Sequence, residues 1–239
     1  DTHMPYDPPT AHWRRSDIER ISGTRARQLY EKMQDDDRTL SDDELATLRR
    51  LYAAEAEYVD HELARLVDDL RSRGLWESTL LVVTADHGEL FGDRQGPGGD
   101  RTGHPSYLCD ALVHVPLVLA GGAVPSVSYD GLVSGLDLAP TVAAALDTTP
   151  PDEWAGQPVG ATDRDEVVST VAGAPDEGSA QIHPDWLHVA VRTADSAVLW
   201  WENETPTEHY RRADGTEYRD DNPVPAEYEH ALDTARAHE

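Results

Sequence analysis

The chain has 239 residues, enough to bury a substantial hydrophobic core. Its 46 acidic and 20 basic residues give a formal net charge of −26, and such a surface repels nucleic acid and anionic membranes. Lys32 is the only lysine, and an acidic, lysine-poor but 38% hydrophobic chain predicts a globular protein adapted to high salt, where ions screen the self-repulsion.

The first strongly predicted element is a long amphipathic helix over residues 41–74. Ser41 and Glu44 have the spacing of a capping box, in which each side chain satisfies a backbone N–H of the first turn. Gly74 follows the last turn, where a glycine commonly ends a helix. Apolar residues recur every three or four positions and predict one buried face. That face comprises Leu45, Leu48, Tyr52, Ala56, Val59, Leu63, Leu66 and Leu70.

The stretch TLLVVT, residues 79–84, is short, β-branched and continuously apolar. This pattern predicts a central strand that is covered on both faces. Asp86 and His87 follow the strand almost at once, and residues 88–103 contain six glycines. We therefore expect a strand that ends in a long, glycine-rich loop.

A second buried strand is predicted in VPLVLAGG, residues 115–122. The segment GLDLAPTVAAALD, residues 135–147, has the pattern of a helix, with Asp137 as a candidate cap. Short strands separated by turn residues follow from residue 166, and a final amphipathic helix is expected over residues 225–239.

These elements predict an α/β protein. A partial domain over residues 1–160 would contain a mixed sheet covered by helices. A smaller, mostly antiparallel subdomain of α+β type would cover residues 161–239.

Asp86 and His87 are the first candidates for a functional site. They lie just beyond the carboxyl end of a predicted strand, where open α/β sheets bind their ligands. A carboxylate oxygen and an imidazole nitrogen suit a divalent metal, although two donors are fewer than a metal needs. The alternative is a turn in which Asp86 accepts backbone hydrogen bonds and His87 has no role of its own.

Two further histidines are candidates because of the segments that carry them. His104 ends the glycine-rich loop, and His3 lies in a proline-rich extended segment. Each either faces a ligand, as functional loop residues do, or is an exposed loop histidine. Glu89 and Asp93 are interpreted as solvated loop acids. The alternative is that they hydrogen-bond to the residues that bind the metal or the substrate. Cys109, the only cysteine, excludes an internal disulfide and is interpreted as a small buried hydrophobe.

Four segments, in this order, resemble the carboxyl-terminal half of a sulfatase, a family of the alkaline phosphatase superfamily. They are DTHMPYDPP, TLLVVTADHGELFGD, GHPSYLCDALVHVPLVLAGG and VSGLDLAPTVAAALD. The end of the chain resembles the sulfatase carboxyl-terminal subdomain, so the resemblance covers nearly the whole chain. It implies an alkaline-phosphatase-like mixed sheet and the hydrolysis of sulfate esters.

The resemblance also implies roles for individual residues. Asp86 and His87 fall at the divalent-metal site, which usually holds calcium in sulfatases and manganese, zinc or magnesium in relatives that cleave phosphates and phosphonates. His3 matches the histidine of the HxPY motif, which contacts the sulfate group or the leaving oxygen. His104 matches the histidine of a later GH loop near the ester, in a region where many sulfatases carry a lysine.

The sulfatase nucleophile motif, Cys/Ser-x-Pro-x-Arg, does not occur in the chain. We therefore expect an amino-terminal half to supply the nucleophile and the remaining metal ligands, and we expect no turnover by this chain alone. The expected partner is a small-molecule or saccharide sulfate ester, with no nucleic acid and no membrane span. The alternatives are a phosphate or phosphonate ester hydrolase or phosphotransferase of the same superfamily, and a non-catalytic domain that keeps the fold and binds a partner.

Overall fold

The computed structural model divides the chain into two compact units. Unit 1 comprises residues 1–79 and 89–105, and unit 2 comprises residues 80–88 and 106–239. The structure describes residues 2–9, 23–33, 40–96, 99–104, 108–122, 124, 129–161, 164–172, 187–201, 204–213 and 216–220. The helix predicted over residues 225–239 lies outside this described part.

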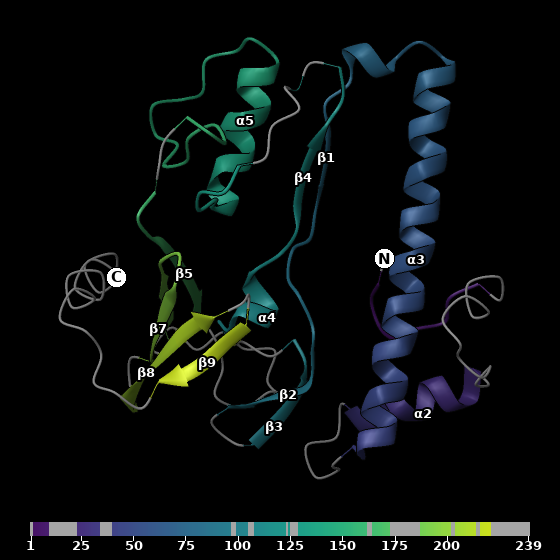
Figure 1. Cartoon of the computed structure of the whole chain (residues 1–239), viewed down its shortest axis with the longest axis vertical. Helices are drawn as coiled ribbons and strands as arrows, with labels where there is room; N and C mark the ends of the chain where they lie inside the picture. Colours follow the sequence, from purple (N-terminus) through teal and green to yellow (C-terminus); the bar gives the residue numbers. More distant parts are fainter. Residues whose placement is uncertain are drawn as a thin grey trace. The chain divides into compact units, whose positions relative to one another are not determined.

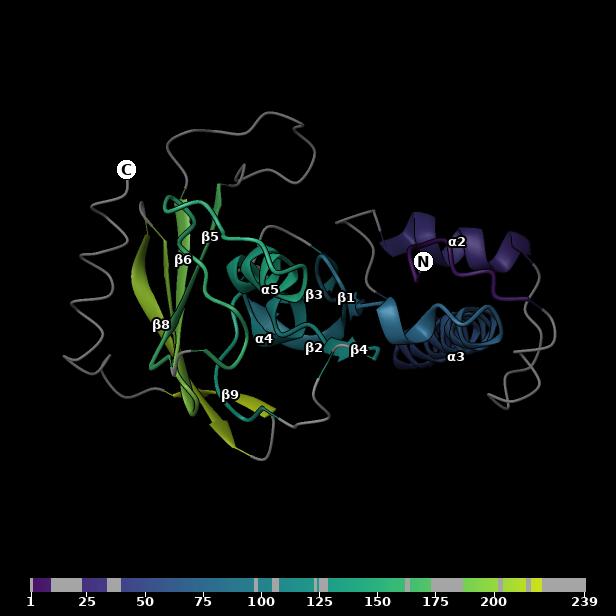
Figure 2. The same ribbon diagram turned by 90° about the horizontal axis from the view of Figure 1, so that it is seen from above.

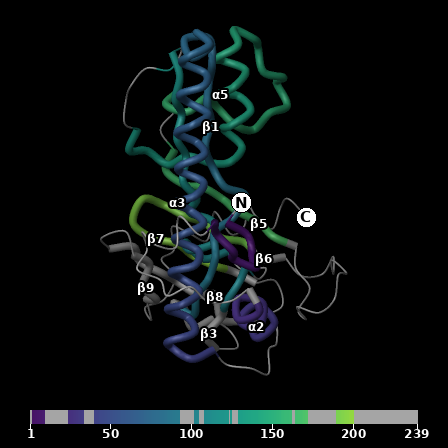
Figure 3. The backbone as a smooth tube through the Cα atoms, turned by 90° about the vertical axis from the view of Figure 1, so that its right-hand side faces the viewer, coloured from purple at the N-terminus to yellow at the C-terminus, as the bar shows by residue number. Residues whose placement is uncertain are grey.

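Unit 1 is built around one long helix, α3 (Asp42–Ser72). Its start confirms the predicted capping box, because Ser41 and Glu44 each accept the other's backbone N–H. Gly74 follows the end of the helix with φ of +69°, a conformation that favours glycine. The shorter helix α2 (Gly23–Met33) lies beside the first turns of α3 (Figures 1 and 3). The one-turn helix η1 (Trp76–Ser78) follows α3 in the chain.

The hydrophobic core of unit 1 lies against the first half of α3. It comprises Met4, Tyr6, Leu29, Leu40, Leu48, Leu51 and Phe91. The predicted helical face is therefore only partly correct: Leu48 is buried, whereas Leu66 is 46% exposed. The difference arises because the buried positions of α3 end at Glu55, so the apolar pattern continues beyond the packed part of the helix.

The prediction of a loop over residues 88–103 is wrong, because strands β2 (Leu90–Gly96) and β3 (Gly99–Gly103) form an antiparallel hairpin there. Leu90 and Phe91 are both buried and anchor the start of β2. The Arg49 guanidinium of α3 also donates a hydrogen bond to the Phe91 carbonyl at 2.9 Å. The glycine-rich composition suggested a loop, whereas burial of Leu90 and Phe91 holds a strand pair in place.

Unit 2 begins with strand β1 (Leu81–Thr84), which pairs antiparallel with β4 (Leu117–Ala120) (Figure 1). Both predicted strands are confirmed, but their expected burial on both faces is not. Thr84 is exposed, and Val118 is 51% exposed. Within the described residues this is a two-stranded sheet, so fewer neighbours cover it than a central strand would have.

The other described residues of unit 2 form three short helical elements and an antiparallel sheet. The helical elements are α4 (Asp110–Val113), the 3₁₀ turn η2 (Gly135–Asp137) and α5 (Leu138–Ala145). The sheet runs in the order β5 (Val167–Ala172), β6 (Leu187–Arg192), β7 (Ser196–Trp201), β8 (Glu204–Ala213) and β9 (Thr216–Asp220). Figure 2 labels four of these strands, β5, β6, β8 and β9. Alternating helices, small sheets and this antiparallel sheet confirm the predicted α/β class. Among the described helices, none has both the length and the apolar character needed to cross a bilayer.

Candidate active site

Asp86 and His87 lie directly after β1, and their side chains approach each other. Asp86 Oδ1 accepts the backbone N–H of His87 at 3.0 Å, and Asp86 Oδ2 lies 3.8 Å from His87 Nε2. His87 Nδ1 lies 2.8 Å from the carbonyl oxygen of Gly88. A carbonyl can only accept a hydrogen bond, so the proton is on Nδ1, and in the neutral ring Nε2 carries the lone pair. The pair thus presents one oxygen and one nitrogen donor atom.

The chemistry of these two donors fits a divalent cation. Metal–ligand bonds of about 2.0–2.6 Å from each atom can span a separation of this size. The Asp86 side chain is 89% exposed and that of His87 is 40% exposed, so an ion can reach both. Metal-binding histidines also commonly donate their other ring N–H to a backbone carbonyl, as His87 does to Gly88. Within the described part of the chain, no group of three or more His, Cys, Asp or Glu side chains has a geometry that could hold a metal ion, so this pair would form part of a metal site.

Gly88, which directly follows Asp86 and His87, contacts helix α4. Its N–H donates a hydrogen bond to the Leu112 carbonyl at 2.8 Å. A Cβ at position 88 would lie 1.9 Å from the Ala111 carbonyl oxygen, so the close approach requires glycine. The buried Arg192 of β6 in turn donates to the Asp110 carboxylate at 2.8 Å, at the start of α4. The position of Asp86 and His87 therefore depends on backbone packing within unit 2.

Four side chains of unit 1 form a second polar group. The rings of His3 and His104 have their centroids 5.6 Å apart. Glu89 accepts hydrogen bonds from His104 Nδ1, at 3.2 Å, and from the Tyr6 hydroxyl, at 3.1 Å. His3 Nδ1 donates to the Met4 carbonyl at 2.8 Å. Segments that are far apart in the sequence thus bring two imidazoles together, each with its Nδ1 on a defined acceptor.

Tyr6 joins this polar group to the core. Its side chain is buried and packs edge-on against Tyr52, with ring centroids 5.6 Å apart. Burial raises the pKa of the Tyr6 phenol, and the negative charge of Glu89 raises it further. The hydroxyl therefore keeps its proton and acts as a hydrogen-bond donor to Glu89.

The structure places the four predicted site residues in two groups. His3 and His104 lie together in unit 1, and Asp86 and His87 lie together in unit 2. The interpretation of Glu89 as a solvated loop acid is wrong, because its side chain is only 5% exposed. The sequence feature that could have indicated its burial is its position directly after the DHG triplet and beside the apolar Leu90–Phe91 pair.

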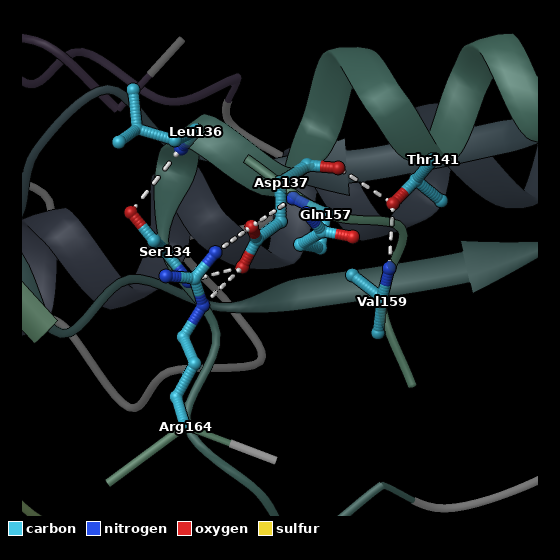
Figure 4. Close-up of polar contacts among 7 residues, drawn as sticks. All are labelled: Ser134, Leu136, Asp137, Thr141, Gln157, Val159 and Arg164. Carbon is cyan, nitrogen blue, oxygen red and sulfur yellow. Dashed lines mark hydrogen bonds and ion pairs between the residues drawn. The ribbon is translucent and has the colours of Figure 1, made fainter. Parts of the chain in front are cut away.

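Asp137 is another buried carboxylate, and it stabilises the fold of unit 2 (Figure 4). It accepts backbone N–H groups from Ser134 and Gln157, both at 2.9 Å, and a double contact from the Arg164 guanidinium. Asp137 does occupy the N-cap position of α5, as predicted, but without a capping hydrogen bond from its side chain to that helix. Ser134 caps the η2 turn, Asp137 reaches back to complete that capping box, and its side chain caps no N–H of α5.

The sulfatase family model matches residues 7–148, which is more than half of the chain. This chain belongs to the sulfatase family. Among curated proteins, the low-salt glycan biosynthesis sulfotransferase Agl7 of Haloferax volcanii is 39% identical over 100 residues, covering 41% of this chain and 24% of Agl7. The choline-sulfatase of Rhizobium meliloti is 30% identical over 102 residues, covering 43% of this chain and 17% of that protein.

Solved structures of related proteins support the alkaline-phosphatase-like fold of this sulfatase-family chain. The phosphonate monoester hydrolase SpPMH from Silicibacter pomeroyi superposes with a TM-score of 0.65 at 22% identity, covering 88% of this chain and 45% of that one. A second structure, BT4656 in complex with D-glucosamine-2-N,6-O-disulfate, has a TM-score of 0.55 at 17% identity, with coverage of 79% and 38%. This chain therefore spans less than half the length of these relatives.

Proposed function

We propose that this sulfatase-family chain contributes to the active site of an enzyme that hydrolyses sulfate esters with the help of a divalent metal. The observation that carries the proposal is the Asp86–His87 pair, whose Oδ2 and Nε2 atoms lie 3.8 Å apart at the end of β1. This pair lies within the segment that matches the family model.

The four site residues would divide the work between charge neutralisation and proton transfer. A cation held by Asp86 and His87 would supply positive charge beside the ester oxygens. His3 and His104 would hydrogen-bond the sulfate group and donate a proton to the leaving oxygen, a role for which imidazole is suited near neutral pH. The sequence contains no Cys/Ser-x-Pro-x-Arg motif, so these residues bind and protonate the substrate but do not attack it.

Calcium is the cation we propose, with manganese, zinc and magnesium as the alternatives. A carboxylate oxygen suits calcium and magnesium, whereas an imidazole nitrogen also suits manganese and zinc. For the substrate we propose a sulfated saccharide, since one matched structure holds a disulfated glucosamine. A phosphate or phosphonate ester is the second candidate, and the observation in its favour is His104 where many sulfatases have a lysine.

Calorimetric titration with calcium and with manganese tests the metal site. The buffer should contain about 1 M NaCl, which shortens the Debye length to about 3 Å and suppresses diffuse ion binding to an acidic surface. We expect weak binding, because two donors leave most of the coordination shell to water. Asp86→Ala should weaken it by at least about tenfold.

Asp152→Ala is the matched control, since Asp152 is an exposed acid of the same unit. It should leave the titration unchanged. Equal binding by the parent chain and Asp86→Ala, or no detectable binding by either, would contradict the proposed site.

We also propose that the protein works in high salt. The support is the net charge of −26 with a single lysine, together with the similarity to a protein of Haloferax volcanii. Salt screens the repulsion between acidic groups in the folded chain. The thermal unfolding midpoint should therefore rise between about 0.1 and 2 M KCl, with screening nearly complete near 1 M. A constant or falling midpoint would refute this assignment.

A further inference from the structure

We propose that Glu89 is a positioning residue for His104, and that it sets which ring nitrogen of His104 faces the substrate. The inference rests on the proposed function for the role of His104. The hydrogen-bond geometry itself is independent of that function. None of the matches to known proteins assigns a role to Glu89.

The strand register explains why Glu89 and His104 meet. Leu90 of β2 is paired with Gly103 of β3, so the residues just outside this pair, Glu89 and His104, lie opposite each other. Gly103 has φ of +81°, and a Cβ there would lie 3.8 Å from the Glu89 carboxylate. That distance is ordinary van der Waals contact, so the positive φ, rather than a lack of space, is what favours glycine before His104.

Both oxygens of Glu89 have defined partners. Oε1 lies 3.2 Å from His104 Nδ1, and Oε2 lies 3.1 Å from the Tyr6 hydroxyl. The Glu89 side chain is 5% exposed, so neither oxygen can easily exchange its partner for water. Tyr6 is buried against Tyr52 and Phe91, which fixes the far end of this chain of hydrogen bonds in the core.

This arrangement determines the tautomer of His104. An ionised carboxylate only accepts hydrogen bonds, so the proton of the neutral ring lies on Nδ1 and Nε2 carries the lone pair. The side chain of His104 is 38% exposed, so the ring is accessible to a substrate. Nε2 is then the atom that can take up a proton and return it to a leaving oxygen, in the way that a carboxylate orients a catalytic histidine elsewhere.

Glu89→Gln separates this positioning role from a purely structural one. Glutamine has nearly the same shape but presents one oxygen and one NH₂ group. The buried Tyr6 hydroxyl needs an acceptor, so the glutamine oxygen should face Tyr6 and the NH₂ group should face His104. His104 Nδ1 must then accept, which moves the ring proton to Nε2.

The experiment is a long-range ¹H–¹⁵N NMR correlation of the histidine rings at about pH 8, where imidazole is ordinarily neutral. His104→Asn assigns the signals. We expect the Nδ1–H tautomer in the unaltered protein, the Nε2–H tautomer in Glu89→Gln, and a return to Nδ1–H in the Tyr6→Phe/Glu89→Gln double variant, where glutamine can turn its oxygen to His104. The exposed His61 of α3 should keep one pattern throughout.

Two outcomes would overturn the inference. One is an Nε2–H tautomer of His104 in the unaltered protein, a result that does not depend on the folding of any variant. The other is an unchanged Nδ1–H tautomer in a folded Glu89→Gln. The readout is ring protonation, so a failure here leaves the calorimetric test of the Asp86–His87 site unaffected, and the converse also holds.

Discussion

Two aspartates of unit 2 show how differently the same side chain can be used. Asp137 is 3% exposed and receives hydrogen bonds from two backbone N–H groups and from Arg164. The Asp86 side chain is 89% exposed and accepts the N–H of the adjacent His87. The chain's own donors surround one carboxylate, whereas the other keeps most of its surface in solvent beside an imidazole nitrogen.

The electrostatic balance at Asp137 supports this contrast. Burial by itself raises the pKa of a carboxyl group, but at Asp137 the hydrogen bonds from Gln157, Ser134 and Arg164 outweigh it and lower the pKa. A carboxylate that is stabilised in its ionised form by internal donors contributes to folding. An exposed one next to a ring nitrogen is suited to bind a ligand from solution.

The largest effect should follow from Asp137→Ala. The change leaves the Arg164 guanidinium and the N–H groups of Ser134 and Gln157 without their acceptor. Removing one partner of such a buried pair should lower the free energy of unfolding by about 3 kcal/mol. The shift of the urea midpoint measures it, and a loss below about 1 kcal/mol would show that the cluster contributes less than its geometry suggests.

The pH dependence of Asp137→Asn provides a control for the charge. The pKa of Asp137 is lowered in the folded state, so its stabilisation is fully present above the ordinary aspartate pKa of about 3.9. It is lost as the pH falls from there through the lowered folded pKa. The difference in unfolding free energy between the parent protein and Asp137→Asn should be constant near neutral pH and should shrink in acid. A difference that grows on acidification would reverse the assigned sign.

A smaller loss of stability is expected for Gly88→Ala. The new Cβ would lie 1.9 Å from the Ala111 carbonyl oxygen, so α4 or the loop must move. Such overpacking should cost about 1–3 kcal/mol. Metal binding should weaken as well, because the loop carries Asp86 and His87.

Gly135→Ala is the matched control for that change. A Cβ at position 135 would have no neighbour within 4 Å, so both stability and metal binding should stay close to those of the parent. If Gly88→Ala behaved in the same way, the close packing of the loop on α4 would not be what positions the pair.

The smallest effect on stability is expected for Asp86→Ala. The side chain is largely exposed, and it contacts the neighbouring His87. The free energy of unfolding should therefore change by no more than about 0.5 kcal/mol in the absence of metal. A urea midpoint that fell as far as for Asp137→Ala would mean that Asp86 has a structural role as well.

Local sequence patterns predicted much of this molecule correctly. Ser41 and Glu44 correctly predicted the start of α3, and the apolar runs correctly predicted β1 and β4. The prediction for residues 88–103 was wrong, because the glycines of this segment suggested a loop where the structure has the β2–β3 hairpin. Local patterns also misjudged the second half of α3, because a helical period shows which face is apolar and not whether anything covers it.

The sequence by itself determined the acidic charge, the capped start of α3 and the strands β1 and β4, because capping and apolar periodicity are local properties. Only the tertiary structure decided how the carboxylates are used. Tyr6 and Glu89 are 83 residues apart, Asp137 and Arg164 are 27 apart, and Glu89 and His104 are 15 apart. Whether a carboxylate ends up in solvent, on an arginine or against a histidine depends on which distant segments the packed core brings beside it.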